Sequence, residues 1–190
     1  MFTLQINENI ILRRPHVDDA PAVFNLFESN RTHLTEWQDS PNKIQTIDDA
    51  RAFIQRHNQA YETGTGLACL IIYNGEPVGM VYLDKIVSVV CKAEIGYWIA
   101  KAYEGQGIVT QSTQGLLAYA FETLKLNRIA LKFKHVSNEH ENQRSRRVAE
   151  RLGFTEEGIL RQDGMTKGVF MDMVMYSLLA EEWHTMHNNA

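Results

Sequence analysis

The chain has 190 residues, of which 44% are hydrophobic and 22% charged, and its formal net charge is −4 at pH 7. This composition is typical of one globular domain that is long enough to bury a substantial core. The negative charge gives no long-range attraction for nucleic acid or an anionic membrane, so neither is expected as a partner. There is no apolar run long enough to span a membrane and no signal-peptide pattern, so we expect a cytoplasmic protein.

Hydrophobic periodicity predicts a first strand over residues 6–14 and then two helices. Asp18 is expected to cap the first helix, because an acidic side chain can accept hydrogen bonds from the free N–H groups of a helix start. Thr46 and Asp49 have the spacing of a capping box with a shortened acid and predict the start of the second helix. Gly64 is expected to end it.

The rest of the chain reads as strands and two further helices. Asn74-Gly75 is a strong turn dipeptide, so it is expected to join two strands in a hairpin. No linker, repeat or low-complexity run divides residues 1–190, so we predict a single α/β (α+β) domain with a mixed sheet. The predicted strands are residues 67–73, 78–84, 92–100, 128–136, 154–160 and 169–179, and the predicted helices start near residues 109 and 142.

The most informative segment is residues 93–110, AEIGYWIAKAYEGQGIVT, where a strand leads through a glycine turn into a helix. Gly105 and Gly107 permit a tight turn and a close approach of the backbone to a ligand. The helix start offers free N–H groups and the positive end of the helix dipole, which suit a phosphate. The Lys-Ser/Thr of a P-loop and the third glycine of a Rossmann fingerprint are both missing. The segment therefore predicts a nucleotide-containing cofactor held in another way.

Glu104-Gly-Gln-Gly-Ile-Val109 resembles motif A of the Gcn5-related N-acetyltransferases (GNAT), Gln/Arg-x-x-Gly-x-Gly/Ala, with Glu104 and Val109 as departures. Residues 142–154, NQRSRRVAERLGF, are similar to the Asn-x-x-Ser-x-x-Val-x-Glu-Lys-Leu-Gly-Phe signature of that superfamily, especially of its RimJ/RimL-type branch. The resemblance spans nearly the whole chain. It implies one GNAT domain with a mostly antiparallel sheet flanked by helices. It also implies an acetyl-CoA-dependent N-acetyltransferase that modifies the N-terminal amine of a ribosomal protein.

The resemblance further implies which residues hold CoA. Backbone amides of the turn would bind the pyrophosphate, and the strand before it would pair with pantetheine. Asn142 would cap its helix or bind the pantetheine amide, and Asn138 is an alternative for that contact. The carboxylate of Glu104 would repel a pyrophosphate unless it points away. The implied cofactor-binding residues are Trp98, Ile99, Gly105, Gln106, Gly107, Ile108, Val109, Thr110 and Asn142.

Two residues are predicted to be catalytic. Glu94 shares a strand face with Trp98 and is our candidate for the general base, acting through water; an ordinary surface glutamate is the alternative. Ser145 lies in the first turn of its helix, where a hydroxyl and the helix dipole could stabilise the CoA thiolate; a purely structural helix-start serine is the alternative. Many relatives have a tyrosine as general acid at the position of Ala149, so Ser145 is the expected substitute.

Other readings of the function stay open at this stage. The acceptor could instead be a small amine such as a polyamine or an aminoglycoside. The missing tyrosine also allows a catalytically weak CoA-binding module. No metal is expected, because His184 and His187 have no partner ligands in their polar tail.

Three further expectations concern packing. The alternating methionines Met171, Met173 and Met175 are predicted to lie in the core. Trp37 is expected either to line the acceptor pocket or to pack as an ordinary aromatic. Residues 86–90, IVSVV, are apolar where a connecting loop is normally polar, so some of them should be exposed. We therefore expect a homodimer or a larger homo-oligomer, with this segment at or near the interface or beside the acceptor cleft; a longer hairpin whose tip folds back onto its own domain is the alternative.

Overall fold

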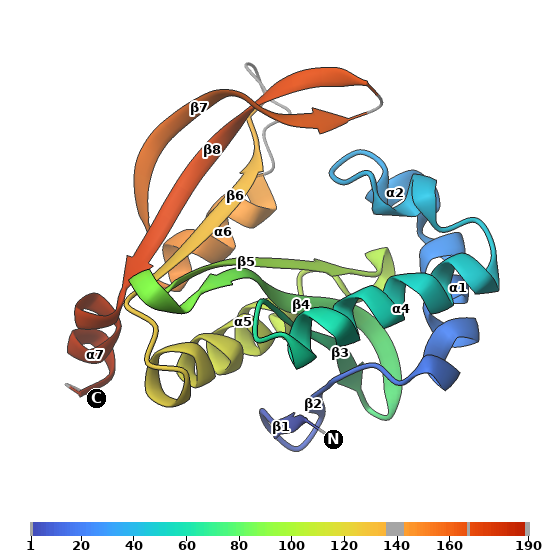
Figure 1. Cartoon of the computed structure of the whole chain (residues 1–190), viewed down its shortest axis with the longest axis horizontal. Helices are drawn as coiled ribbons and strands as arrows, with labels where there is room; N and C mark the ends of the chain where they lie inside the picture. The colour runs from blue at the N-terminus through green and yellow to red at the C-terminus, as the bar shows by residue number, and fades with distance from the viewer. Residues whose placement is uncertain (1, 136–142, 167, 189–190) are drawn as a thin grey trace.

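Within the residues that the computed structural model describes (2–135, 143–166 and 168–188), one eight-stranded sheet organises the fold (Figure 1). The strands are β1 (Thr3–Gln5), β2 (Ile10–Arg13), β3 (Leu67–Tyr73), β4 (Glu76–Val87), β5 (Lys92–Ile99), β6 (Arg128–Lys134), β7 (Thr155–Thr166) and β8 (Val169–Leu179). Their order is β1-β2-β3-β4-β5-β6-β8-β7, and only the β5–β6 pair is parallel. The predicted mixed, mostly antiparallel sheet is confirmed.

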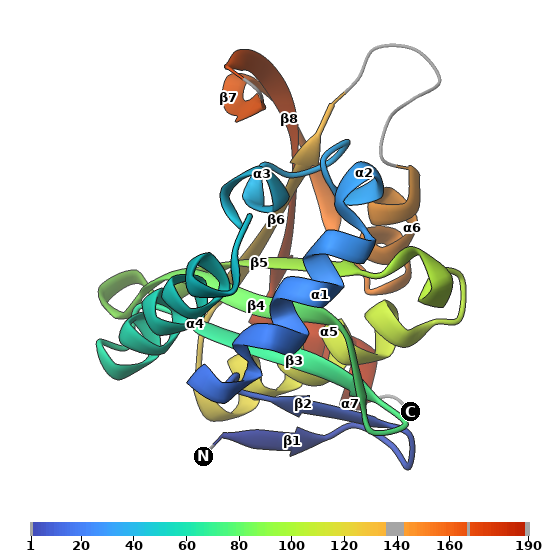
Figure 2. The same ribbon diagram turned by 90° about the vertical axis from the view of Figure 1, so that its right-hand side faces the viewer.

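Helices cover both faces of this sheet (Figure 2). On one face lie α1 (Ala20–Ser29) and α4 (Ile47–Glu62), and on the other lie α5 (Ile108–Ala118) and α6 (Gln143–Arg151). None of the helices described has both the length and the apolar character needed to cross a membrane. The remaining helical segments are α2 (Arg31–Leu34), α3 (Ser40–Lys43), α7 (Ala180–Asn188), the short turns η1 (Val17–Asp19), η2 (Ser88–Val90) and η3 (Lys101–Tyr103), and the π-helical turn η4 (Tyr119–Thr123).

Strand β5 divides its side chains between two apolar layers, as its alternation predicts. Trp98 packs on Phe27 of α1, with 4.6 Å between the ring centroids. Ile95 and Ile99 belong to the cluster on the opposite face, which includes Leu116 of α5. Both faces of β5 are therefore held by packing, which fixes its position in the sheet.

The predicted first strand over residues 6–14 is too long, because only Ile10–Arg13 (β2) forms a strand and residues 6–9 form the connection to β1. The side-chain oxygen of Asn7 accepts hydrogen bonds from the backbone N–H groups of Asn9 (2.8 Å) and Ile10 (2.9 Å). Such local bonds compete with strand pairing. The two short strands then pair with each other in antiparallel fashion.

Asp18 does not cap the first long helix, which begins at Ala20 after the 3-10 turn η1. The next residue, Asp19, occupies the N-cap position instead. Its carboxylate accepts two hydrogen bonds from the Arg13 guanidinium (2.8 and 2.9 Å). The capping box of the second helix is confirmed. The Asp49 N–H donates to Thr46 Oγ1 (3.1 Å), and the Thr46 N–H donates to the Asp49 carboxylate (2.9 Å).

The methionines of β8 are half-buried and do not form the core, which corrects the prediction made for them. The β6–β8–β7 pairing turns the opposite face of β8 toward the helices, so that face is buried instead. The buried side chains of β8 are Val174, Tyr176, Ser177 and Leu178.

The apolar segment at residues 86–90 extends β4 to Val87 and continues as the turn η2. Its valines are exposed, with relative accessibilities of 40% for Val87, 94% for Val89 and 55% for Val90. The predicted exposure is confirmed.

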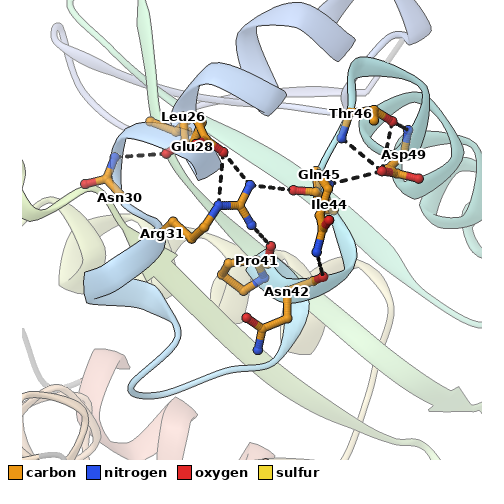
Figure 3. Close-up of polar contacts among 10 residues, drawn as sticks. All are labelled: Leu26, Glu28, Asn30, Arg31, Pro41, Asn42, Ile44, Gln45, Thr46 and Asp49. Atoms are coloured by element: carbon orange, nitrogen blue, oxygen red, sulfur yellow. Dashed lines mark hydrogen bonds and ion pairs between the residues drawn. The ribbon is translucent and has the colours of Figure 1, made fainter. Parts of the chain in front are cut away.

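One arginine holds the connection between α1 and α4 in place (Figure 3). The Arg31 guanidinium donates to the Glu28 carboxylate and to the main-chain oxygens of Pro41 and Ile44 (2.8 Å to Ile44). A planar guanidinium can reach several acceptors at once, so a single side chain closes this loop of about a dozen residues. These hydrogen bonds hold the segment from α2 to α3 against the end of α1.

Candidate active site

Strands β5 and β6 pair over only four positions, from Lys92↔Arg128 to Ile95↔Leu131. Beyond these positions β5 follows β4 as far as Gly79↔Ile99, whereas β6 follows β8 as far as Lys134↔Met173. Beyond Ile95 and Leu131 the two strands therefore no longer form backbone hydrogen bonds with each other. A pocket of about 530 Å³ lies at this opening and is lined by residues 96–99 and 131–134, among others.

The glycine turn closes one end of the pocket. Gly105 and Gly107 have φ angles of 74° and 76°, in the left-handed region where a glycine is favoured. Gly107 is the N-cap of α5, and because it is a glycine the start of this helix has no cap from its own N-cap side chain among the described contacts. The first N–H groups of α5 therefore have no acceptor within the helix, and they stand beside the positive end of the helix dipole.

These two features fit the two parts of CoA. An uncapped helix start suits a pyrophosphate, and the edge of β5 beyond Ile95 offers backbone groups to the amides of pantetheine. The structure brings most of the predicted cofactor residues together in the pocket lining: Trp98, Ile99, Gly105, Gly107, Ile108, Val109 and Thr110. Gln106 does not line the pocket, and its side chain donates to the main-chain oxygen of Ala102 (3.1 Å). Asn138 and Asn142 lie outside the described residues.

Helix α6 supplies the opposite wall. Ser145 lines the pocket, and its main-chain oxygen accepts a hydrogen bond from the Tyr97 hydroxyl of β5 (3.3 Å). Burial raises the pKa of Tyr97, which therefore stays protonated and keeps this bond. Ala149, at the position where relatives have a tyrosine, is completely buried and does not line the pocket. Arg144, Arg147 and Arg151, spaced so that they share one helix face, also line the pocket.

Glu94, the predicted general base, does not line the pocket. Its carboxylate lies between two lysines, at 2.9 Å from Lys85 Nζ and 3.3 Å from Lys132 Nζ, and the side chain is 30% exposed. Its assignment as the base stays a prediction. Within the described residues, no cluster of three or more His, Cys, Asp or Glu side chains could hold a metal ion.

A third wall of the pocket comes from the segment from α2 to α3, which Arg31 holds in place. Most of its residues were not predicted from the sequence. This wall contains His33, Leu34, Trp37 and Gln38, and it faces Tyr82 across the pocket. Trp37 therefore takes the first of the two positions considered for it. No sequence pattern marks the other three residues, because they approach the glycine turn only in the folded chain. The Lys101 N–H donates to Asn30 Oδ1 (2.9 Å) and so ties this segment to η3.

The carboxylate of the unusual Glu104 in the turn is held by side chains from two other elements. Its carboxylate pairs with His33 (Oε1 to Nε2, 3.0 Å) and with the Arg144 guanidinium. The Arg144 guanidinium offsets a charge that would otherwise repel a pyrophosphate. The sequence departure is thus accommodated by residues from α2 and α6.

Three features meet at this pocket: the separation of β5 from β6, the start of α5 behind the glycine turn, and Ser145 of α6. Together they define the class of protein, an acyltransferase that binds acetyl-CoA as co-substrate. The family model described as "Acetyltransferase (GNAT) domain" matches residues 9–155 of the chain. The chain belongs to this family of acetyltransferases.

Relatives of the chain cover nearly its full length. It is 39% identical to a Bacillus subtilis (strain 168) protein named "Putative ribosomal N-acetyltransferase YdaF", over 96% of this chain and 98% of that one. It is 27% identical to the ribosomal-protein-serine acetyltransferase of Escherichia coli (strain K12), over 94% and 97%. Its fold is similar to that of RimL, a ribosomal L7/L12 alpha-N-protein acetyltransferase solved with coenzyme A, with a TM-score of 0.86, 27% identity and coverage of 94% and 98%.

The glycine turn gives a direct test of cofactor binding. Gly107→Ala should weaken acetyl-CoA binding by about tenfold or more, because the left-handed conformation costs an alanine roughly 1–2 kcal/mol and the turn must relax. Gly64→Ala is the matched control: Gly64 has a φ of 68° and open space around it, and it lies outside the pocket lining. Both variants should lose stability, but only Gly107→Ala should lose affinity by titration calorimetry. Equal affinity in both would contradict this role of the turn.

Proposed function

We propose that this acetyltransferase modifies the N-terminal α-amino group of a protein, with a ribosomal protein as the acceptor. The names of two relatives that match nearly the full chain support this acceptor class. Such a substrate also implies a cytoplasmic location.

The charge of the pocket is the observation that carries the choice of acceptor. Its described lining contains five cationic side chains and one carboxylate. That carboxylate, Glu104, is already paired. A polyamine carries several positive charges and needs carboxylates to bind, so this lining disfavours it. A peptide N-terminus brings one charge and main-chain groups for hydrogen bonding. The cations are Lys132, Lys134, Arg144, Arg147 and Arg151.

The residues of the chain divide the work of the reaction. Acetyl-CoA supplies the activated acetyl group. The N–H groups at the start of α5 hold the pyrophosphate, and the β5 backbone at Trp98 and Ile99 holds the pantetheine arm. The Ser145 hydroxyl, in the first turn of α6, stabilises the departing thiolate together with the helix dipole.

A competition between amine classes tests the proposed acceptor. With acetyl-CoA, N-terminal peptides of ribosomal proteins should be acetylated at the α-amine, whereas spermidine and aminoglycosides should react far more slowly. Mass spectrometry of the products and release of free CoA thiol provide the two measurements. Faster acetylation of spermidine would instead support the small-amine reading, as in the more distant relatives named spermidine N(1)-acetyltransferase, which are 25% identical over 60% of this chain. Acetyl-CoA binding without turnover on any amine would support the CoA-binding module.

Ser145→Ala tests support for the leaving group. We expect kcat to fall by roughly tenfold to a thousandfold, with little change in acetyl-CoA affinity, because the thiolate charge develops only during the reaction. Ser29→Ala is the control, since Ser29 is exposed at the end of α1 and outside the pocket lining. An unchanged kcat in Ser145→Ala would leave this serine a structural role only.

We also propose that the exposed valines after β4 form a contact between two copies of the chain. An exposed apolar patch on a folded domain usually marks a contact surface. Replacing Val87 and Val89 with serine should shift the mass measured by light scattering toward that of a monomer at a given protein concentration. A wild-type protein that is already monomeric, or a variant with unchanged mass, would contradict the proposal.

A further inference from the structure

Glu104 and His33 form a carboxylate–imidazole pair inside the pocket. His33 comes from α2 and Glu104 from the glycine turn, and both line the pocket. The side chains are 15% and 17% exposed, and Nε2 lies 3.0 Å from Oε1. The other carboxylate oxygen of Glu104 pairs with Arg144 of α6. Three walls of the pocket therefore meet at one carboxylate.

This geometry sets the state of the imidazole. A ring nitrogen that faces a carboxylate carries the proton and donates it as a hydrogen bond, so the other nitrogen keeps its lone pair. The carboxylate lies 3.0 Å from Nε2, and this pairing assigns the proton to Nε2 and leaves the lone pair on Nδ1. Among the contacts of the described residues, none engages Nδ1, and this atom is not one of the buried polar atoms that lack a partner, so it is accessible to solvent. A carboxylate that orients an imidazole in this way is the arrangement that makes histidine an effective base.

The proposed reaction needs a base that works near neutral pH, because a protonated α-amine with a pKa near about 8 cannot attack a thioester. Among the described residues of the pocket lining, His33 is the only histidine. Glu94 lies outside the lining, and its carboxylate forms ion pairs with Lys85 and Lys132. The other charged or titratable side chains that face the pocket are Glu104, Tyr82, Tyr97, Tyr103, Lys132, Lys134, Arg144, Arg147 and Arg151.

We propose that His33 is the general base of the acetyl transfer and that Glu104 is its positioning residue, an assignment that rests on the proposed N-acetyltransferase reaction. Nδ1 of His33 takes one proton from the acceptor ammonium group, directly or through one water. The freed nitrogen lone pair forms the C–N bond to the thioester carbonyl carbon, and the C–S bond breaks. A second proton from that nitrogen ends on the CoA sulfur, and His33 returns its own proton to solvent. Glu104 stabilises the imidazolium formed in between, and Arg144 pairs with the other oxygen of that carboxylate.

The pH dependence of His33→Gln tests this role, with whichever amine the wild type acetylates. We expect kcat to fall by roughly a hundredfold near pH 7 and the deficit to shrink toward pH 9.5, where the acceptor loses its proton unaided. Glu104→Gln keeps a hydrogen-bond acceptor but loses the charge, so it should show a smaller loss of the same pH form. Neither change should weaken acetyl-CoA binding. Added imidazole should restore part of the activity of His33→Ala, which separates lost chemistry from lost folding.

Two comparisons complete the experiment. His184→Gln is the matched control, since His184 is exposed on α7 and outside the pocket lining. Glu94→Gln decides between the two candidate bases, and only one of the pair should show the pH-dependent deficit. A rate for His33→Gln within twofold of wild type, or a deficit that is equal at every pH, would overturn the proposal. Turnover of a polyamine but not of a peptide would overturn the proposed acceptor alone, because the same pH comparison then applies to the polyamine.

Discussion

The separation of β5 from β6 is the constraint on which the site depends. Each strand follows a different neighbour: β5 stays with β4 to Ile99, and β6 stays with β8 to Lys134. Gly79 allows the first of these pairings, since a Cβ there would lie 2.3 Å from the Trp98 carbonyl oxygen. Backbone groups on the divided edges lack strand partners, which costs about 1–3 kcal/mol for each group that is buried and unpaired. A ligand with amide groups of its own can recover that energy.

The walls around this opening come from distant parts of the chain, and polar side chains tie them together. Arg31 fixes the segment that carries His33 and Trp37 (Figure 3). Asn30 connects that segment to η3. Tyr97 joins β5 to α6 through the main chain of Ser145. The walls of the pocket are therefore one connected unit, and the carboxylate that pairs with His33 comes from the glycine turn itself.

Local sequence signals predicted the glycine turn and the start of α5, because the residues that build them are neighbours in the chain. The glycine turn and the start of α5 occupy one short stretch, and the left-handed φ angles require glycine at Gly105 and Gly107. Capping at Thr46 and alternation in β5 were readable for the same reason. The errors arose where a nearby side chain decided the outcome: Asn7 interrupted the first strand, and Asp19, bonded to Arg13, took the place expected for Asp18.

By itself the sequence determined the class of fold, the glycine turn and the helix that carries Ser145, since periodicity, glycine and capping residues act over a few positions. Only the tertiary structure decided which groups share the pocket. It placed Glu94 between two lysines and turned Glu104 toward His33. These contacts join residues that are far apart in the chain, and nothing in the local pattern specifies them. Their positions depend on where β5 and β6 separate and on how Arg31 holds the facing wall, and both are set by packing and pairing across the whole domain.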